Sequence, residues 1–305
     1  MRLAFIKCHG SGNDFPLIDA RAIALDDADW ARVARALADR AGPVGGDGLL
    51  LLVDGDDSHA FGMRMFNSDG SEAETCLNGL RCVARAGFEA LGIDAARVKL
   101  KTSSADVARE AELAPGVVTV RTTVGPASTD LTAVGVRGSL DALPSERDFT
   151  AIAMPNPHLV TFVEAVDEAE LVALGEYCEG APPLLPGRAN VSFVEQRGPD
   201  LFVRTFERGV GLTDSCGSAM AASVLAAMLT GRVPVGAEVR VFNKGGLVRG
   251  RADADRVVTI HGNATFLYDA SIEIDPASGA LAPPVIHARR ADEANAWSTA
   301  VAALR

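Results

Sequence analysis

The apolar residues of this chain recur at helical spacing in three segments. Within Asp27–Arg40 they fall at positions i, i+3, i+4 and i+7, from Trp30 to Leu37, which is the pattern of a helix with one buried face. The same spacing predicts helices over Asn78–Leu91 and Ser218–Leu229. A glycine follows each segment within two residues as a stop signal.

Short apolar runs between turn residues predict strands. The clearest is Leu49–Val53, a continuous apolar run bounded by glycines and aspartates, which is typical of a buried strand. The other runs are Leu3–Ile6, Leu17–Asp19, Val98–Lys101, Val117–Arg121, Leu159–Val163, Val191–Val194, Phe202–Phe206, Val239–Phe242, Gly246–Val248 and Val257–Ile260. Many strands and few helices predict an α/β protein of the α+β type with mixed sheets, rather than a regular βαβ repeat.

Two short sequences recur at one offset, which indicates an internal duplication. The stretch Arg64–Asn67 (RMFN) returns 140 residues later as Arg204–Glu207 (RTFE), and Glu74–Cys76 (ETC) returns at the same offset as Asp214–Cys216 (DSC). Unrelated strand–loop–helix units could look alike, but two matches at one offset favour two similar halves. A length of 305 residues also fits about two domains.

Composition excludes several classes of protein. Apolar residues make up 48% of the chain, enough for two cores, so a disordered chain is excluded. The formal charge of −11 and the scattered lysines argue against a nucleic-acid partner, which would need a basic patch. No apolar stretch approaches the roughly 18–20 residues of a membrane span, and the N-terminus lacks a signal-peptide pattern, so no membrane association is expected.

The five cysteines are odd in number and widely spaced, which is not the pattern of a disulfide framework. No CxxC pair occurs and the histidines lie far apart, so no metal site is expected. A reducing, cytoplasmic compartment is the simplest expectation. We interpret Cys8, Cys82 and Cys178 as small buried apolar residues.

Cys76 and Cys216 hold equivalent places in the two halves, each in a loop that enters a predicted helix. The helix dipole and the backbone N–H groups of a helix start favour a thiolate. If the halves face each other, one sulfur can remove a proton from a carbon while the other delivers a proton to its opposite face. The segments Cys76–Gly79 and Cys216–Ala219 can offer N–H donors to a carboxylate beside that carbon.

Ordered motifs over about Leu3–Tyr268 resemble the diaminopimelate epimerase family, whose members invert one α-carbon without a cofactor. The most specific motif is Phe66–Cys82 (FNSDGSEAETCLNGLRC). The others are His9–Phe15 (HGSGNDF), Gly45–Leu52 (GGDGLLLL), Met154–Val160 (MPNPHLV), Ala189–Val194 (ANVSFV) and Glu207–Ala219 (ERGVGLTDSCGSA).

The resemblance implies two structurally similar domains, each a curled mixed β-sheet around a central helix, with the active site in the cleft between them. Residues 1–117 would form the first domain, joined by a C-terminal strand at 265–274, and residues 118–264 the second. Residues 275–305 would be an extra tail with a proline-bearing linker and an alanine-rich final helix. The implied activity is the PLP-independent inversion of LL-diaminopimelate to meso-diaminopimelate for lysine and cell-wall precursor synthesis, by a homodimer.

The resemblance also implies roles for single residues. Cys76 and Cys216 would be the two catalytic bases. His158 and Glu207 would hold the substrate's α-amino group and tune the thiols, and Arg208 would bind the distal carboxylate through its bidentate fork. Hydrogen bonds to other amino-acid groups would come from the side chains of Asn13, Asn67, Asn156 and Asn190. The carboxylate at the reacting carbon would be bound by the backbone of Leu77, Asn78, Gly217 and Ser218.

Several positions depart from the residues usual in the family. Leu77 and Pro155 replace glycines, Ala189 replaces a threonine, Leu212 replaces a glutamate, Ser218-Ala219 replaces Thr-Gly, and Asn263-Ala264 replaces Pro-Ala. The leucine narrows the pocket or excludes a positive φ at that point. Since both thiols remain while the lining changes, two-thiol chemistry on a different amino acid is compatible with this pattern.

Three alternatives therefore stay open. One is a related cofactor-independent racemase of another polar amino acid, for example histidine. Another is a thiol redox protein that uses Cys76 and Cys216, which would leave Asn67, Asn190 and the Glu207-Arg208 pair without a purpose. A non-catalytic descendant is disfavoured because both cysteines are present.

Overall fold

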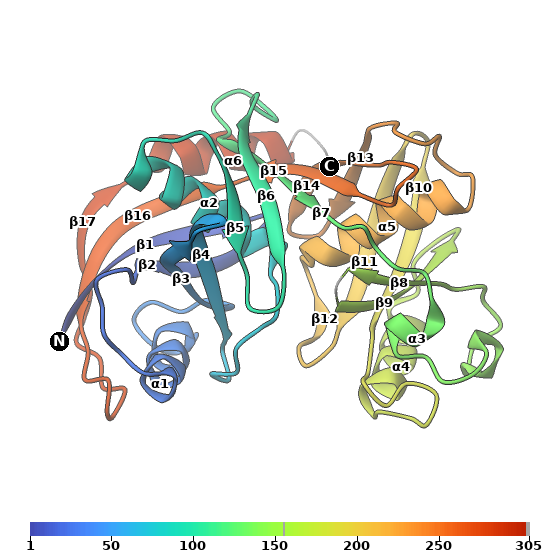
Figure 1. The fold of residues 1–305 in the computed structure, drawn as a ribbon, viewed down its shortest axis with the longest axis horizontal. Helices are drawn as coiled ribbons and strands as arrows, with labels where there is room; N and C mark the ends of the chain where they lie inside the picture. The colour runs from blue at the N-terminus through green and yellow to red at the C-terminus, as the bar shows by residue number, and fades with distance from the viewer. Residues whose placement is uncertain (155, 303–305) are drawn as a thin grey trace. The chain divides into compact units, whose positions relative to one another are not determined.

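The computed structural model describes residues 1–154 and 156–302, which divide into two compact units. One unit holds residues 1–122 and the chain from residue 261 onward, and the other is Thr123–Ile260. The chain leaves the first unit within strand β7 (Thr119–Val124) and returns within β15 (Val258–Asn263), as the colours of Figure 1 show. No helix in the described residues is long and apolar enough to cross a membrane.

A mixed sheet forms the body of the first unit. Its neighbouring strands are, in order, β17 (Val285–Arg289), β16 (Thr265–Glu273), β1 (Arg2–Gly10), β2 (Asn13–Asp19), β3 (Gly48–Asp56), β4 (His59–Asn67), β5 (Ala95–Lys99) and β6 (Ser104–Glu110). The pairs β2–β3 and β4–β5 are parallel and the others antiparallel. Helix α2 (Leu77–Leu91) contacts every strand from β1 to β6.

A second helix of this unit, α1 (Asp27–Ala38), packs against the opposite face of the same sheet. Leu49 and Leu51 of β3 join the core around Trp30 of α1, whereas Leu50 lies against the start of α2 at Gly79. Successive side chains of a strand point to opposite faces, so the apolar run of β3 fills both layers. This explains why its sequence is continuously apolar instead of alternating.

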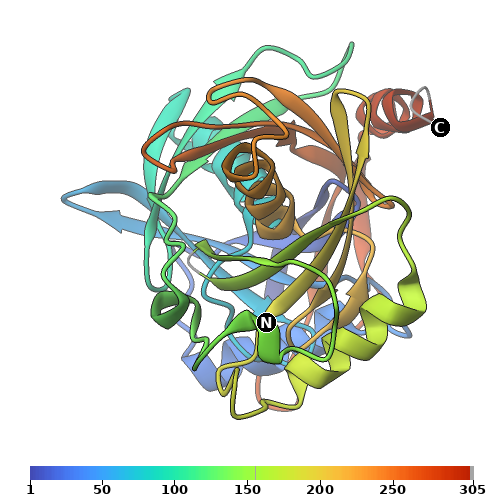
Figure 2. The same cartoon turned by 90° about the vertical axis from the view of Figure 1, so that its right-hand side faces the viewer.

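The second unit repeats this plan. Its sheet runs through β8 (Thr150–Met154), β9 (Asn156–Val163), β10 (Asn190–Arg197), β11 (Asp200–Glu207), β13 (Val239–Asn243) and β14 (Gly246–Ala252), and β12 (Gly211–Thr213) pairs with the end of β11. Helix α5 (Gly217–Leu229) contacts all six main strands, and α4 (Glu168–Glu179) covers the outside. Figure 2 shows orange α5 enclosed by strands and yellow-green α4 on the exterior. Two short helices, α3 (Leu131–Val134) and η1 (Leu140–Ala142), precede β8.

The registers confirm that the two halves are copies of one architecture. In each unit a parallel pair, Leu17 opposite Leu50 and Leu159 opposite Val191, leads into an antiparallel hairpin and then into the central helix. The central helices begin at Leu77 and Gly217, 140 residues apart, as the sequence echo predicts. The predicted fold class, two similar α+β units with a curled mixed sheet around a central helix, is therefore confirmed.

Helix α5 has few polar side chains because the sheet of its unit surrounds it. Eleven consecutive residues of α5, Gly217–Ala227, are buried, and most of them are small. A helix that is apolar all round is stable only where every face is covered. In α2 the small residue at Gly87 serves the same need, because a Cβ there would lie 2.7 Å from the ring of Phe61.

The three predicted helices are confirmed, and their ends lie within two residues of the predicted ones. Helix α4 was missed although its buried residues Leu171, Leu174, Gly175 and Cys178 follow helical spacing. Asp167 caps it by accepting hydrogen bonds from two first-turn N–H groups, a signal that the sequence also contains. Strand β6 was missed because its buried residues Ala105 and Val107 are separated by the charged Asp106 and form no apolar run.

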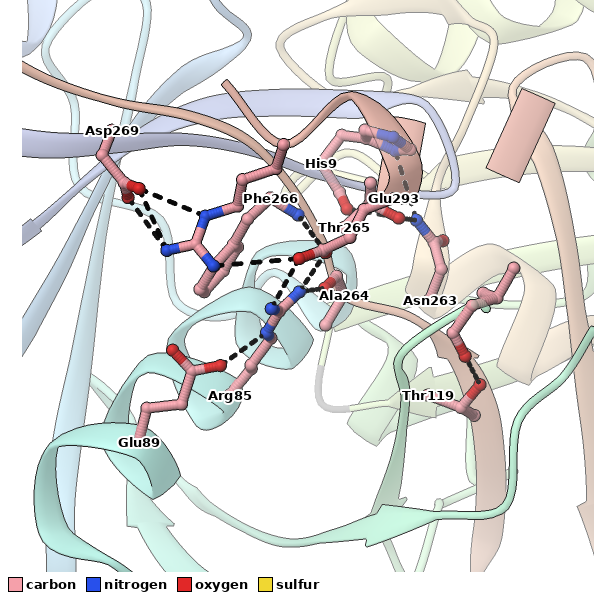
Figure 3. Close-up of polar contacts among 12 residues, drawn as sticks. His9, Arg85, Glu89, Thr119, Asn263, Ala264, Thr265, Phe266, Asp269 and Glu293 are labelled. Carbon is pink, nitrogen blue, oxygen red and sulfur yellow. Dashed lines mark hydrogen bonds and ion pairs between the residues drawn. The ribbon is translucent and has the colours of Figure 1, made fainter. Parts of the chain in front are cut away.

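The tail packs against the first unit instead of extending from it. Strand β17 pairs with β16, and the alanine-rich segment forms helix α6 (Ala291–Ala302); residues 303–305 lie outside the described part. The buried ring of Trp297 lies 5.7 Å from the ring of His9. Glu293 accepts hydrogen bonds from both terminal nitrogens of Arg85 on α2, and Arg85 stacks on Phe266 at 3.9 Å (Figure 3).

Replacing Glu293 by glutamine tests how much this docking stabilises the unit. Burial alone would raise the pKa of Glu293, but hydrogen bonding to Arg85 holds it below the ordinary 4.5. A lowered pKa gives stability that is present above about pH 4.5 and is lost as the pH falls through the folded value. Glu293→Gln should lower the unfolding free energy by about 2 kcal/mol at pH 7. This loss is smaller than that for breaking a fully buried ion pair, because Glu293 keeps some exposure to solvent.

Urea unfolding at pH 7 and near pH 4 measures this effect. The difference between wild type and Glu293→Gln should shrink at the lower pH. Glu89→Gln is the matched control, because Glu89 pairs with the same arginine from a more exposed position. It should change the stability by less than about 0.5 kcal/mol. Equal losses for the two variants would contradict a specific docking role for Glu293.

Candidate active site

The first group of candidate residues surrounds the start of α2. Cys76 is the N-cap of this helix, and its sulfur accepts a hydrogen bond from the backbone N–H of Gly79 at 3.4 Å. The thiol also lies 3.8 Å from Oδ1 of Asn13, toward which it can donate. Only glycine fits at position 79, because a Cβ would lie 2.6 Å from Leu50 and 3.3 Å from the sulfur. The helix start therefore offers an N–H donor to a sulfur anion.

Asp47 fixes the orientation of the Asn13 amide. The Nδ2 atom of Asn13 donates to a carboxylate oxygen of Asp47, which can only accept, so Oδ1 must face the thiol. Arg40 donates to the other oxygen of Asp47 at 2.6 Å. Sequence reasoning missed Asp47, although its place in the glycine-rich motif Gly45–Leu52 was a signal.

The two residues after Cys76 are buried in the first turn of α2. Leu77 adopts a helical conformation, so the replacement of a usual glycine requires no positive φ here, and its side chain is buried. The side chain of Asn78 accepts a hydrogen bond from Arg81 at 3.0 Å. Asn67 lies at the end of β4, where its amide donates to the hydroxyl of Ser71 at 3.0 Å.

The second group surrounds the start of α5. Cys216 is the N-cap residue, and its sulfur lies 3.5 Å from the hydroxyl of Ser218. The same hydroxyl accepts a hydrogen bond from Nδ2 of Asn156 at 3.1 Å. The other amide atom of Asn156, Oδ1, is buried and has no hydrogen-bond partner in the described part of the chain. Such an acceptor can bind an N–H of a ligand. Pro155, which precedes Asn156 and stands where the family usually has a glycine, lies outside the described residues.

Three polar residues of the second unit form a connected row. His158 and Asn190 are direct neighbours in the parallel pair β9–β10, and Nδ2 of Asn190 lies 3.4 Å from Nε2 of the histidine. Oδ1 of Asn190 accepts the backbone N–H of Arg208 at 2.8 Å, and the Arg208 side chain donates to the carbonyl of Gly187 at 3.1 Å. Glu207, the last residue of β11, directly precedes this arginine.

His158 is electrically neutral at physiological pH. Complete burial lowers its pKa from 6.5 to about 3, and the positive charge of Arg208 contributes to the same direction. A neutral imidazole keeps one nitrogen that can accept a hydrogen bond. The prediction that His158 binds an amino group thus requires it to act as an acceptor of N–H bonds rather than as a charged partner.

The structure thus divides the predicted residues between the two units. In the second unit, hydrogen bonds and close contacts connect them in two sets, which are Asn156, Ser218 and Cys216, and His158, Asn190 and Arg208. Asn13, Cys76, Leu77 and Asn78 meet in the first, with Asn67 at the end of the neighbouring strand β4, whereas Asn156, His158, Asn190, Glu207, Arg208, Cys216, Gly217 and Ser218 belong to the second. The remaining cysteines are buried, as expected. Burial raises the pKa of Cys178 to about 12 and that of Cys8 well above its ordinary value, which excludes both as thiolates near neutral pH.

Comparison with known proteins agrees with this arrangement. The family model of diaminopimelate epimerase matches residues 5–128 and 150–267. Diaminopimelate epimerase from Clostridium acetobutylicum is 36% identical over 290 residues, which cover 90% of this chain and 87% of the relative. The enzyme of the same name from Lactiplantibacillus plantarum is 36% identical over 303 residues, covering 91% of each chain.

Solved structures show the same fold at low sequence identity. A predicted epimerase from Pseudomonas aeruginosa has a TM-score of 0.67 and 18% identity, over 90% of this chain and all of the other. A hydroxyproline epimerase from Agrobacterium vitis has a TM-score of 0.64 and 14% identity, over 99% of this chain and 98% of the other. The family match over both units and the identity to full-length relatives lead to one conclusion: this chain belongs to the diaminopimelate epimerase family.

Proposed function

We propose that this protein inverts LL-diaminopimelate to meso-diaminopimelate without pyridoxal phosphate, with Cys76 and Cys216 as its two bases. The observation that carries the proposal is the repeated placement of a thiol at the N-cap of the buried central helix of each unit. Inversion of a carbon needs one base on each of its faces, and a duplicated fold supplies two equivalent groups. The proposal includes a homodimer and a cytoplasmic location, where both thiols stay reduced.

In the proposed reaction one sulfur, as a thiolate, takes the α-proton from one face of the substrate. The electron pair left on the carbon spreads into the adjacent carboxylate, so negative charge builds on its oxygens. Backbone N–H groups of the first turns, at Leu77 and Asn78 and at Gly217 and Ser218, would stabilise that charge. The second thiol then delivers its proton to the opposite face, which leaves the first sulfur protonated and the second as the thiolate.

The remaining residues of the second unit would hold the substrate. The neutral imidazole of His158 and the carboxylate of Glu207 would accept the N–H bonds of the α-ammonium group, as would the unpartnered Oδ1 of Asn156. Arg208 would bind the distal carboxylate. The side-chain amides of Asn13, Asn67 and Asn190 would form hydrogen bonds with the other groups of the amino-acid substrate.

Hydrogen exchange in heavy water tests the proposal. The reduced enzyme, without added pyridoxal phosphate, should place deuterium at the α-carbon of diaminopimelate and produce the other stereoisomer, as seen by NMR. Histidine and proline serve as comparison substrates. Faster exchange with histidine would favour a racemase of another amino acid. No exchange with any of these amino acids would contradict the proposal.

A further inference from the structure

Arg81 is a buried cation on the central helix that carries Cys76, and the reaction described above gives it no role. Its side chain is fully buried, and it lies five residues beyond the N-cap position of the thiol on α2. Within the described residues, no carboxylate lies within ion-pair distance of its guanidinium. Burying a charge without an opposite charge costs several kcal/mol, so such a residue is retained only where its charge or geometry is needed.

The guanidinium is held by four neutral acceptors. Its Nε donates to the carbonyl of Asn263 at 2.9 Å, and one terminal nitrogen donates to the hydroxyl of Ser11 and to Oδ1 of Asn78, both at 3.0 Å. The other terminal nitrogen reaches the carbonyl of Leu77 at 3.4 Å. Arg81 thereby joins the first turn of α2 to the loop at Ser11, which leads into strand β2 and its first residue, Asn13.

Asn263 completes this connection from the other side. Its Oδ1 accepts the backbone N–H of Ser11 at 2.7 Å, and its Nδ2 donates to the carbonyl of His9 at 3.2 Å. Asn263, which stands where the family usually has a proline, thus anchors the same loop at Ser11 that Arg81 contacts. Figure 3 shows Asn263 beside His9.

We propose that Arg81 is a positioning residue of the first half of the site: it fixes Leu77, Asn78 and the Ser11 loop, and its buried charge is balanced by the Cys76 thiolate and the substrate carboxylate. The inference rests on the proposed function, because that function brings both anions to the start of α2. It explains how a half-buried thiol can lose its proton, since a fixed cation nearby favours the charged form.

Three titratable groups interact with this guanidinium. Burial lowers the pKa of Arg81 to about 10, whereas the charges of Cys82 and Cys76 act in the opposite direction. Because the attraction is mutual, the guanidinium favours the charged form of Cys76. Burial lowers the pKa of His9 to about 4, so His9 is neutral and adds no positive charge. Arg81 is therefore a cation of α2 that acts on Cys76 near neutral pH.

The pH dependence of Cys76 alkylation tests this inference in the full-length protein. Iodoacetamide reacts with thiolates, and mass spectrometry of the Cys76 peptide gives the rate at each pH. In Arg81→Met the midpoint of the rate profile should move upward by about one pH unit or more, because the attracting charge is lost. In Arg81→Lys the positive charge remains, so the midpoint should stay within about 0.3 pH units of wild type. The value of kcat/KM should still fall, because an ammonium group cannot replace the planar guanidinium that holds several acceptors in fixed positions.

Arg85→Met is the matched control. Arg85 lies one turn further along α2 and is also buried, but it pairs with Glu293 and Glu89. Its replacement should lower stability without moving the Cys76 midpoint. If Arg81→Met does not fold, Arg81→Gln takes its place as the uncharged variant.

An unchanged midpoint in the folded, uncharged variant would overturn the inference, as would equal shifts in the uncharged and lysine variants. Because alkylation needs no substrate, the result is independent of the proposed function. A shifted midpoint without any α-hydrogen exchange would refute the epimerase reaction and leave in place only the effect of Arg81 on the Cys76 thiol.

Discussion

Replacing either Cys76 or Cys216 by serine should lower the rate of inversion by at least about 10³-fold. A serine hydroxyl is far too weak an acid to be ionised near neutral pH, so each variant lacks one base or one proton donor. The two variants should fail in different ways. Each keeps one thiol and can still remove and return a proton on one face, so it should exchange the α-hydrogen of one stereoisomer with retention.

Proton NMR in heavy water distinguishes these outcomes. Cys76→Ser and Cys216→Ser should exchange opposite stereoisomers, and neither should produce the other isomer at an appreciable rate. Cys178→Ala is the control, because Cys178 is a buried core residue of α4 in the second unit. It should keep its inversion rate and lose only stability. Exchange of the same isomer by both serine variants would contradict a mechanism with one thiol on each face.

The sequence contained most of the information needed for the repeated architecture. Helical spacing identified α1, α2 and α5 because each buries a defined set of apolar positions in a sheet-covered core. The offset of 140 residues located both N-cap cysteines, since a duplicated unit keeps the spacing from strand to helix. Strand β17 had no such signal, because all five of its residues are exposed and only its pairing with β16 defines it.

The site residues that sequence reasoning missed act through other residues. Asp47 was not singled out because its importance depends on the position of Asn13, more than thirty residues away in the chain. Arg81 looked like an ordinary polar residue of an amphipathic helix, since no pattern reveals that the sheet closes around α2. His158 was assigned to the site from its motif, but its neutral state follows from burial, which only the folded structure gives.

A direct test of substrate recognition is the replacement of Arg208 by methionine. If Arg208 binds the distal carboxylate, the variant should lose about 10²–10³-fold in kcat/KM for diaminopimelate, mainly through a higher KM. At about 1.4 kcal/mol per factor of ten this is about 2.8–4.2 kcal/mol, which lies within the roughly 2–5 kcal/mol that truncating one partner of a buried charge pair costs. Arg208→Lys should recover only part of the loss, because an ammonium group cannot bind a carboxylate through a fork.

The substrate comparison decides whether the loss comes from the distal group. Lysine lacks the distal carboxylate, so its slow α-hydrogen exchange should be equally slow in wild type and Arg208→Met. The pH profile should also stay unchanged above about pH 6, because burial, the larger cause of the low pKa of His158, is still present. Arg188→Met, which removes an arginine paired with Glu179, should leave kcat/KM within about twofold of wild type. Equal losses for both substrates would show that Arg208 acts at the reacting end instead, next to Asn190 and His158, and would remove the main argument for a dicarboxylic substrate.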